Sequence, residues 1–269
     1  MNKQNPITKK FKTIIKNFFR SRNIEFYRRA PKLKILEAIS LLKPNELGHP
    51  LIRVGGKGDG GYLIPDLLNN IKYCFSPGVG QISAFEAEIK NRGIKSFLAD
   101  FTVDGPAAED LFDFKKKFIK SFNSENSITF DDWIKNSVDE KEKDFLVQMD
   151  IEGSEYEVIN SISNLNLERI KIIVIEFHHL QFLTNEVFLE NFLSVLKKLN
   201  TYFEVNHIHP NNCCGITKVD EIIIPNVLEV TFLNKNYVKK KSNIKTLPNI
   251  LDSKNVEKKK DIFLSNHWF

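Results

Sequence analysis

Short apolar runs alternate with amphipathic stretches over most of this chain. Runs such as Lys171–Phe177 are rich in β-branched residues and lead directly into polar ones, which is typical of strands buried on both faces of a parallel sheet. The intervening stretches repeat apolar residues at helical spacing. The pattern predicts strands over Ile71–Phe75, Lys95–Ala99, Ser127–Phe130, Phe145–Met149, Lys171–Phe177, Tyr202–Asn206 and Val227–Leu233, and helices over Ser83–Asn91, Ala108–Phe122, Asp131–Asn136, Glu155–Ile162 and Glu186–Leu199.

This order of elements predicts an α/β fold. Strands that alternate with helices form a mostly parallel sheet with helices on both faces. The last strand, Val227–Leu233, follows a loop rather than a helix. Because a strand without a crossover helix can pair in the opposite direction, we expect it to be antiparallel.

The two ends of the chain differ from the centre. Phe11, Ile14, Ile15, Phe18 and Phe19 fall on one face of a predicted helix whose other face is basic, and a second helix is predicted over Pro31–Leu42. We therefore divide the chain into a basic helical extension (1–45), an α/β domain (46–238) and a Lys/Asn-rich tail (239–269) that docks loosely. The extension could pack on the domain or a second subunit, which we favour, or lie on an anionic membrane surface.

Composition narrows the function classes. The chain has 269 residues and a net charge of +5, concentrated in basic clusters at its ends. The sequence lacks the interleaved basic and aromatic residues that are typical of nucleic-acid binding. No apolar run is long enough to span a membrane. Three cysteines give neither a disulfide framework nor a CxxC site, so a reducing, cytoplasmic location is expected, with peripheral contact at the inner face of a membrane as an option.

Candidate chemistry gathers where the predicted strands end. Gly78 and Gly80 follow the first of these strands and would allow backbone to approach a ligand closely. Asp100 ends the next strand, where an acid can accept the hydroxyls of a ribose. Position 83 is Ser83 rather than the third glycine of GxGxxG, which favours a ligand smaller than a dinucleotide.

The segment after Met149 carries two further carboxylates, Asp150 and Glu152. Gly153 would permit a tight turn, and Ser154 with Glu157 has the spacing of a capping box. The carboxylates could therefore belong to a site or only to a helix cap. Because the carboxyl ends of parallel strands meet at one edge, we expect Asp150 beside Gly78 and Asp100.

Histidines follow the next two strands. Glu176, His178 and His179 close one strand, and His207 and His209 belong to the segment after the other. A neutral histidine could act as a general base. Asp150, Glu176 and His178 could instead ligate a divalent metal, which we leave open because no zinc-like spacing occurs.

A glycine-rich segment, Arg53–Asp66, precedes the first predicted strand of the domain. It lacks the GK[ST] ending of a P-loop and is read as a hairpin or loop. Asp59, Gly60 and Tyr62 within it could still reach the site.

These motifs together resemble the FkbM-type family of S-adenosylmethionine-dependent methyltransferases. The matching segments are DGGY, SPGVGQISAFEAEI, LADFTVDGP, SITFDDW, VQMDIEGSEYEVI and VIEFHHL, and the resemblance covers roughly residues 50–235. It implies a Rossmann-like methyltransferase fold and O-methylation, often of sugars or natural products. The glycine loop departs from the family pattern, since Ser76 stands in place of the leading acid and the third glycine is missing.

The resemblance also implies roles for individual residues. Gly78 and Gly80 would approach the methionine part of the cofactor and Asp100 its ribose, with Asp59 and Gly60 also in the cofactor site. Asp150 and Glu152 would line the junction of cofactor and substrate. His178, or else His209, would help to remove the hydroxyl proton.

The expected function is O-methylation of a sugar, glycan or other small hydroxylated acceptor. The alternative is a non-catalytic module that retains the fold and attaches glycan-synthesis machinery to a membrane. The basic extension and the incomplete glycine loop favour this alternative. An NAD-dependent oxidoreductase ranks below both because the third glycine is absent.

Overall fold

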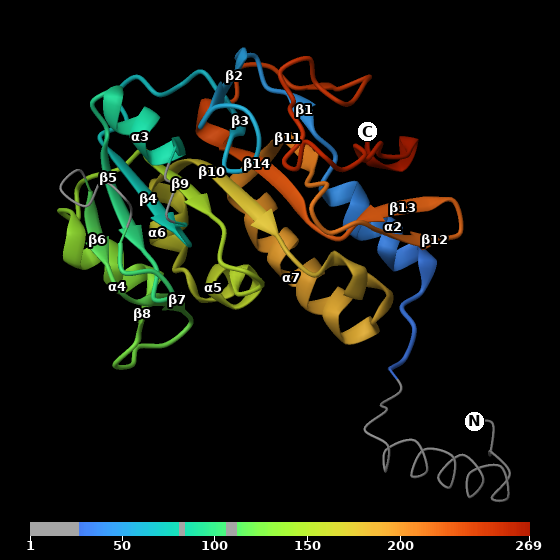
Figure 1. Cartoon of the computed structure of the whole chain (residues 1–269), viewed down its shortest axis with the longest axis horizontal. Helices are drawn as coiled ribbons and strands as arrows, with labels where there is room; N and C mark the ends of the chain where they lie inside the picture. Colours follow the sequence, from blue (N-terminus) through green and yellow to red (C-terminus); the bar gives the residue numbers. More distant parts are fainter. Residues whose placement is uncertain (1–26, 81–83, 106–111) are drawn as a thin grey trace, which may run out of the picture.

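The computed structural model describes residues 27–80, 84–105 and 112–269. The predicted N-terminal helix through Phe11–Phe19 lies outside these residues. The centre of the fold is a seven-stranded sheet in the order β11-β14-β10-β9-β4-β5-β6 (Figure 1). Its strands are β4 (Tyr73–Pro77), β5 (Lys95–Ala99), β6 (Asp113–Lys115), β9 (Phe145–Met149), β10 (Ile170–Phe177), β11 (Phe203–Pro210) and β14 (Leu228–Asn234).

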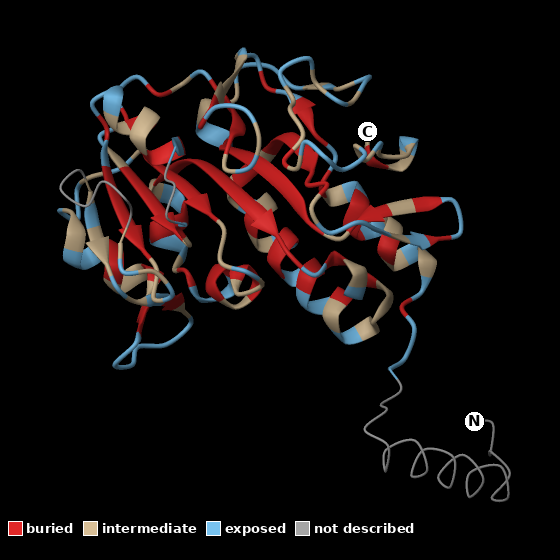
Figure 2. Ribbon diagram, in the orientation of Figure 1, coloured by how far each residue is buried: buried red, intermediate tan, exposed pale blue. Residues whose placement is uncertain are grey.

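The direction of these strands confirms the predicted α/β fold. The strands from β10 through β9 and β4 to β5 and β6 pair in parallel. β14 pairs antiparallel with both of its neighbours, β10 and β11. Every residue of β9, β10 and β14 is buried (Figure 2). Burial on both faces explains why β9 and β10 are mostly apolar.

Side chains from the two faces of the sheet enter two separate cores. Phe145 and Val147 of β9 point into the larger core, whereas Leu146 points into the smaller one. The larger core is shared with α2 (Lys32–Leu41), α4 (Phe130–Ser137), α5 (Glu155–Ser161), α6 (Asn164–Arg169) and α7 (Glu186–Tyr202). The smaller is closed by α3 (Ala84–Asn91) and by β2 (Leu51–Val54) with β3 (Tyr62–Pro65). Helices therefore cover both faces, but a β-hairpin completes one of them.

Small sheets and single turns surround this centre. The glycine-rich segment forms the antiparallel β2–β3 hairpin, as expected. The remaining elements are β1 (Asn45–Glu46) paired with β15 (Ser242–Asn243), β7 (Phe118–Lys120) with β8 (Ser127–Thr129), β12 (Ile216–Val219) with β13 (Ile222–Pro225), and the 3₁₀ turns η2 (Leu180–Thr184), η3 (Lys235–Tyr237) and η4 (Asn266–Trp268).

The helix predicted over Ala108–Phe122 is wrong for the part that the structure describes. Residues 113–115 form β6 at the edge of the sheet, and residues 118–120 form β7. The phenylalanines that suggested a helical stripe are used separately; Phe118 packs against Phe101 with ring centroids 4.9 Å apart. Lysines beside and between these strands suit an exposed edge, where charge discourages pairing with other chains.

The C-terminal segment is not loosely docked. Trp268 is fully buried, and its indole Nε1–H donates to the carbonyl oxygen of Ile223 at 2.8 Å. Earlier in the same segment, Asp252 accepts a hydrogen bond from His207 at 2.9 Å. Residues 239–269 therefore pack as part of the folded domain.

The adjacent Cys213 and Cys214 form a disulfide, although the number of cysteines predicted no disulfide framework. Cys74 is free and buried.

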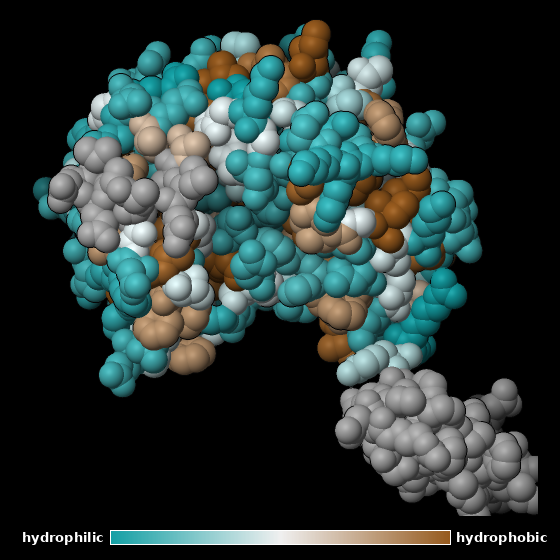
Figure 3. All heavy atoms as spheres, in the orientation of Figure 1, coloured by the Kyte–Doolittle hydropathy of each residue, from teal (hydrophilic) through white to brown (hydrophobic). Residues whose placement is uncertain are grey.

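The surface seen in Figure 3 is largely hydrophilic, with hydrophobic side chains in separate small patches. Among the described helices, none has both the length and the apolar character needed to cross a membrane.

Candidate active site

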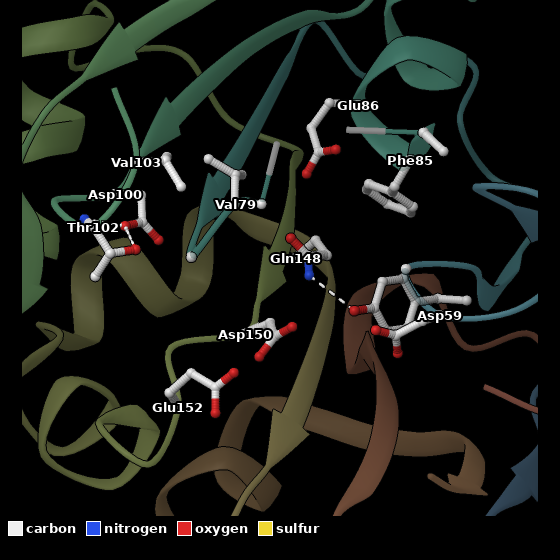
Figure 4. A pocket seen from close by; sticks show the side chains of 15 residues that line it. Asp59, Val79, Phe85, Glu86, Asp100, Thr102, Val103, Gln148, Asp150 and Glu152 are labelled. Carbon is white, nitrogen blue, oxygen red and sulfur yellow. Dashed lines mark hydrogen bonds between the residues drawn. The ribbon is translucent and has the colours of Figure 1, made fainter. Parts of the chain in front are cut away.

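A cavity of about 640 Å³ lies at the carboxyl ends of β4, β5 and β9. All six residues proposed from sequence to bind the cofactor line it, namely Asp59, Gly60, Gly78, Gly80, Asp100 and Asp150. Glu152 lines it as well. Figure 4 shows Asp100 and Asp59 on opposite sides of this cavity, with Asp150 and Glu152 between them. The sheet edge thus brings together the strand ends that the sequence analysis grouped.

Gly78 is required where β4 passes the end of β9. Its φ is +80°, and a Cβ built on it would lie 1.5 Å from the carbonyl oxygen of Asp150. Backbone hydrogen bonds tie this loop to both neighbouring strands, from Asp150 N after β9 to Pro77 O at 3.1 Å and from Gly78 N to Ala99 O of β5 at 2.9 Å. No side chain fits between Gly78 and the Asp150 carbonyl, and Gly78 itself lines the cavity.

Asp100 forms the side of the cavity at the end of β5. Its Oδ1 accepts hydrogen bonds from the backbone N–H and the hydroxyl of Thr102, both at 2.6 Å. Its other carboxylate oxygen makes no hydrogen bond within the described residues. The carboxylate is therefore fixed in place while one oxygen remains free for a ligand's hydroxyl groups.

The inner wall contains a carboxylate that the sequence analysis missed, Glu86 of α3. Ser76 stands where the resemblance described above implies an acid, and its hydroxyl lies against Glu86 and against Gln148. Burial raises the pKa of Glu86. A carboxyl group thus reaches the position of the missing acid from the neighbouring helix. The signal for this was a glutamate three residues before Ile89 on the buried side of α3.

The turn after β9 places acids around His178. Glu152 and Gly153 both have positive φ values, +52° and +101°. The Nε2 atom of His178 lies 3.5 Å from Glu152 Oε2 and 3.7 Å from Asp150 Oδ1. Glu155 is fully buried, and its Oε1 accepts from His178 Nδ1 at 3.0 Å.

The capping box predicted for α5 does not form. Ser154 makes no capping hydrogen bond, and Lys120 instead donates to its hydroxyl. Glu157 pairs with the same lysine at 3.2 Å. Glu155 takes over the helix start, since its Oε1 accepts the backbone N–H groups of Ile151 and Gly153, each at 3.1 Å. In this segment Glu155 therefore stabilises the turn after β9, while Glu152 remains a carboxylate of the cavity lining.

Several acids of this region share one poorly solvated space. Burial, together with the neighbouring carboxylates, raises the pKa of Asp150 to about 7, although His178 opposes this shift. Burial also raises the pKa of Glu176 well above its usual range. Oxygen and nitrogen atoms of Asp150, Glu176 and His178 lie within 4.8 Å of one another, so these three groups could hold a cation. A positively charged ligand would relieve their mutual repulsion.

His209 belongs to a neighbouring polar cluster and is not among the residues that line the cavity. Its Nδ1 lies 3.5 Å from Asp252 Oδ1, and it stands opposite Glu229 in the β11–β14 pair. Burial alone would raise the pKa of Asp252, but the hydrogen bond from His207 and the nearby ring of His209 outweigh it and lower that pKa. His178 does not line the cavity either, but its Nε2 lies within 3.7 Å of Asp150 and Glu152, which do line it, whereas His209 has no such contact with a lining residue.

The two clusters are joined through asparagines. Asn211 donates to Glu176 Oε1 at 2.9 Å and to Asp59 Oδ1 at 3.4 Å. Asn255 donates to Asp59 Oδ1 at 3.2 Å and to Glu229 Oε1 at 2.5 Å. The C-terminal segment therefore supports one wall of the cavity.

Several solved structures of methyltransferases are similar to this chain at low sequence identity. A TehB-like SAM-dependent methyltransferase from Corynebacterium glutamicum is 14% identical, with a TM-score of 0.30, and the match covers 86% of this chain and 100% of that one. A candidate RNA methyltransferase from Pyrococcus horikoshii is 13% identical, with a TM-score of 0.34 and coverage of 76% and 99%. These scores carry no argument about substrate. No curated protein matches the chain.

Comparison with models of protein families identifies the family of this chain. The pattern described as Methyltransferase FkbM domain matches residues 30–207, more than half of the chain. That range contains the β2–β3 hairpin, the glycine loop, Asp100, Asp150 and His178. None of the comparisons supports a metal, and we assign none. The chain belongs to the FkbM methyltransferase family.

Proposed function

We propose that this protein transfers a methyl group from S-adenosylmethionine to a hydroxyl group of a sugar or glycan. The observation that carries the proposal is the cavity at the carboxyl ends of β4, β5 and β9, which has Asp100 on one side and the His178–Asp150 pair next to its floor. The family supplies the reaction class, and the acidic, hydrogen-bonding lining supports a polar acceptor.

The residues present fit the cofactor. Gly78 and Gly80 line the cavity, so their backbone is within reach of a ligand there. The free oxygen of Asp100 suits ribose hydroxyl groups, and Glu86 with Asp150 suits the positive charges of the methionine part. When bound, S-adenosylmethionine supplies a methyl group activated by its sulfonium. Charge complementarity and close backbone approach are thus both satisfied by this chain's own residues.

The acceptor hydroxyl would sit between the cofactor and His178. The cofactor would supply the methyl group for the new C–O bond and would leave as a neutral thioether that keeps the electron pair of the former C–S bond. His178 Nε2 would take the hydroxyl proton, and Asp150, whose Oδ1 is 3.7 Å from that nitrogen, would orient the hydroxyl group. Orientation accounts for most of the rate gain, and a positioned base adds about 10²–10⁴-fold.

Calorimetry with S-adenosylmethionine tests the cofactor site. We expect Asp100→Ala to weaken binding about 10–100-fold, because a charge-assisted hydrogen bond contributes about 1.5–3 kcal/mol. Asp113→Ala is the matched control, since Asp113 is exposed at the sheet edge and lies outside the cavity lining. No binding to the intact protein would contradict the proposal.

The acceptor class is tested separately. Wild-type protein and S-adenosylmethionine are incubated with methyl glycosides and nucleotide sugars, and with an amine and an RNA as non-hydroxyl and polyanionic comparisons. Mass spectrometry should find O-methylated sugar. Methylation of only the amine or the RNA would rule out the proposed acceptor, and binding without any transfer would favour a non-catalytic module.

A further inference from the structure

One buried carboxylate at the site has no role in the function proposed so far. Glu155 has no exposed surface, and its Oε1 accepts three hydrogen bonds. Two come from the backbone N–H groups of Ile151 and Gly153, and the third comes from His178 Nδ1 at 3.0 Å. The same oxygen therefore fixes the turn that carries Asp150 and Glu152 and the ring that stands beside them.

The surroundings of His178 determine which nitrogen carries the hydrogen. Nδ1 faces two acceptors, Glu155 Oε1 at 3.0 Å and the carbonyl oxygen of Glu176 at 3.1 Å. Neither can donate, so Nδ1 must be protonated. Nε2 makes no hydrogen bond within the described part of the chain and faces Asp150 and Glu152 at the cavity. Its lone pair is thus free to accept a proton on that side.

We propose that Glu155 is a positioning residue that holds His178 in the Nδ1-protonated form, with Nε2 directed at the acceptor hydroxyl. This inference rests on the proposed function. The hydroxyl proton moves to Nε2 while Nδ1 keeps its own, so the ring becomes an imidazolium beside the carboxylate of Glu155. No proton passes to Glu155, and the imidazolium later loses its Nε2 proton to solvent.

The charges around the ring support this role. Burial would lower the pKa of His178, but the hydrogen bond and negative charge of Glu155, followed by the charges of Asp150 and Glu152, raise it. Glu176, near the end of β10 just before His178, is another acid that faces the ring, with Oε1 at 3.9 Å from Nε2. A buried partner with fixed geometry holds the imidazolium more effectively than the exposed Glu152 can.

A purely structural role for Glu155 is the competing explanation, because it also clamps the turn. Glu155→Gln separates the two. The glutamine oxygen can still accept the backbone N–H groups, so the turn is kept, but the negative charge beside His178 is lost. Glu157→Gln is the matched control, since Glu157 lies on the same helix and pairs with Lys120 rather than with a histidine.

The first measurement needs neither cofactor nor acceptor. Nitrogen NMR of histidine-labelled wild-type protein, with His178→Gln to assign the signal, should show His178 protonated at Nδ1. In Glu155→Gln the Nδ1 proton should move upfield as its hydrogen bond weakens, and Glu157→Gln should leave it unchanged. At a pH high enough for the ring to be neutral, a His178 protonated at Nε2 instead of Nδ1 in wild type would overturn the inference, whether or not any variant folds.

The second measurement uses S-adenosylmethionine and the best acceptor from the sugar panel. We expect Glu155→Gln to lower kcat about 10–100-fold while the KM for the acceptor and the Kd for S-adenosylmethionine change less than about threefold. An unchanged kcat would overturn the inference. Absence of cofactor binding to wild type would instead overturn the proposed function, and the NMR result would still decide the Glu155–His178 contact.

Discussion

Asp150 shows most directly that the site is arranged for a ligand rather than for stability. Its pKa is raised to about 7, and its Oδ1 is buried without a hydrogen bond in the described structure. In the unfolded chain this carboxyl ionises near its ordinary pKa, several units lower. The folded protein therefore loses stability as the pH rises from about 4 to about 7, because the unfolded state releases the proton first.

Asp150→Asn should consequently stabilise the ligand-free protein above neutral pH. At about pH 8 we expect a gain of about 1–2 kcal/mol, or roughly 2–6 °C in Tm. At about pH 4 the two proteins should melt together, since both side chains are neutral. Differential scanning calorimetry across this range measures the effect, with the exposed Asp113→Asn as control. A gain that is equal at both pH values would show that charge is not its cause.

Gly78 makes a second residue-level test, because its close approach can be separated from its backbone conformation. Gly93 has nearly the same φ, +81° against +80°, but a Cβ there would meet no atom within 4 Å. Gly93→Ala should cost about 1–2 kcal/mol for the left-handed conformation alone. Gly78→Ala should cost at least about 2 kcal/mol more, because the Cβ must displace the Asp150 carbonyl.

Urea unfolding of both glycine variants measures this difference, and calorimetry with S-adenosylmethionine shows whether the cavity survives. We expect cofactor binding to be lost in Gly78→Ala and kept in Gly93→Ala. Equal destabilisation of the two variants would mean that the loop moves away at little cost, so that Gly78 is not needed for the crossing over β9.

The residues that sequence reasoning placed correctly and those it missed differ in a physical way. Gly78, Asp100 and Asp150 follow strands directly, and parallel strands deliver their ends to one edge of a sheet. Glu86 and Glu155 lie on helices, where their importance comes from facing inward. Each is a glutamate on the apolar side of its helix, which could have been recognised as a buried charge that requires a partner.

At the scale of elements, burial decided what could be predicted. β9 and β10 are covered on both faces, so their apolar runs stand out in the sequence. β6 lies at the edge and has no fully buried residue, so its sequence lacks the apolar run of a buried strand and suggests a helix instead. The pair β1–β15 joins segments from opposite ends of the described chain, so no local pattern predicts it. The turn after β9 was predicted, but not which glutamate would close it.

At the scale of the whole molecule, the site depends on parts of the chain that are far apart in sequence. Asp59 of the β2–β3 loop and Asn255 near the C-terminus are 196 residues apart, yet they are hydrogen-bonded beside the cavity. Composition alone marked residues 239–269 as a tail, because lysines and asparagines suggested a solvated segment. The buried Trp268 reverses that interpretation, since a large apolar side chain outweighs many exposed polar ones.

Trp268→Ala tests whether the C-terminal segment is part of the fold. The indole is fully buried next to α2 and donates to Ile223, so its removal leaves a large cavity and an unpaired carbonyl. We expect a loss of about 3–5 kcal/mol in urea unfolding monitored by circular dichroism. Phe263→Ala, in the same segment but 67% exposed, should change stability by less than about 0.5 kcal/mol. If the two variants were equally stable, the segment would be a weakly attached tail, and its contact through Asn255 could not support the wall of the cavity.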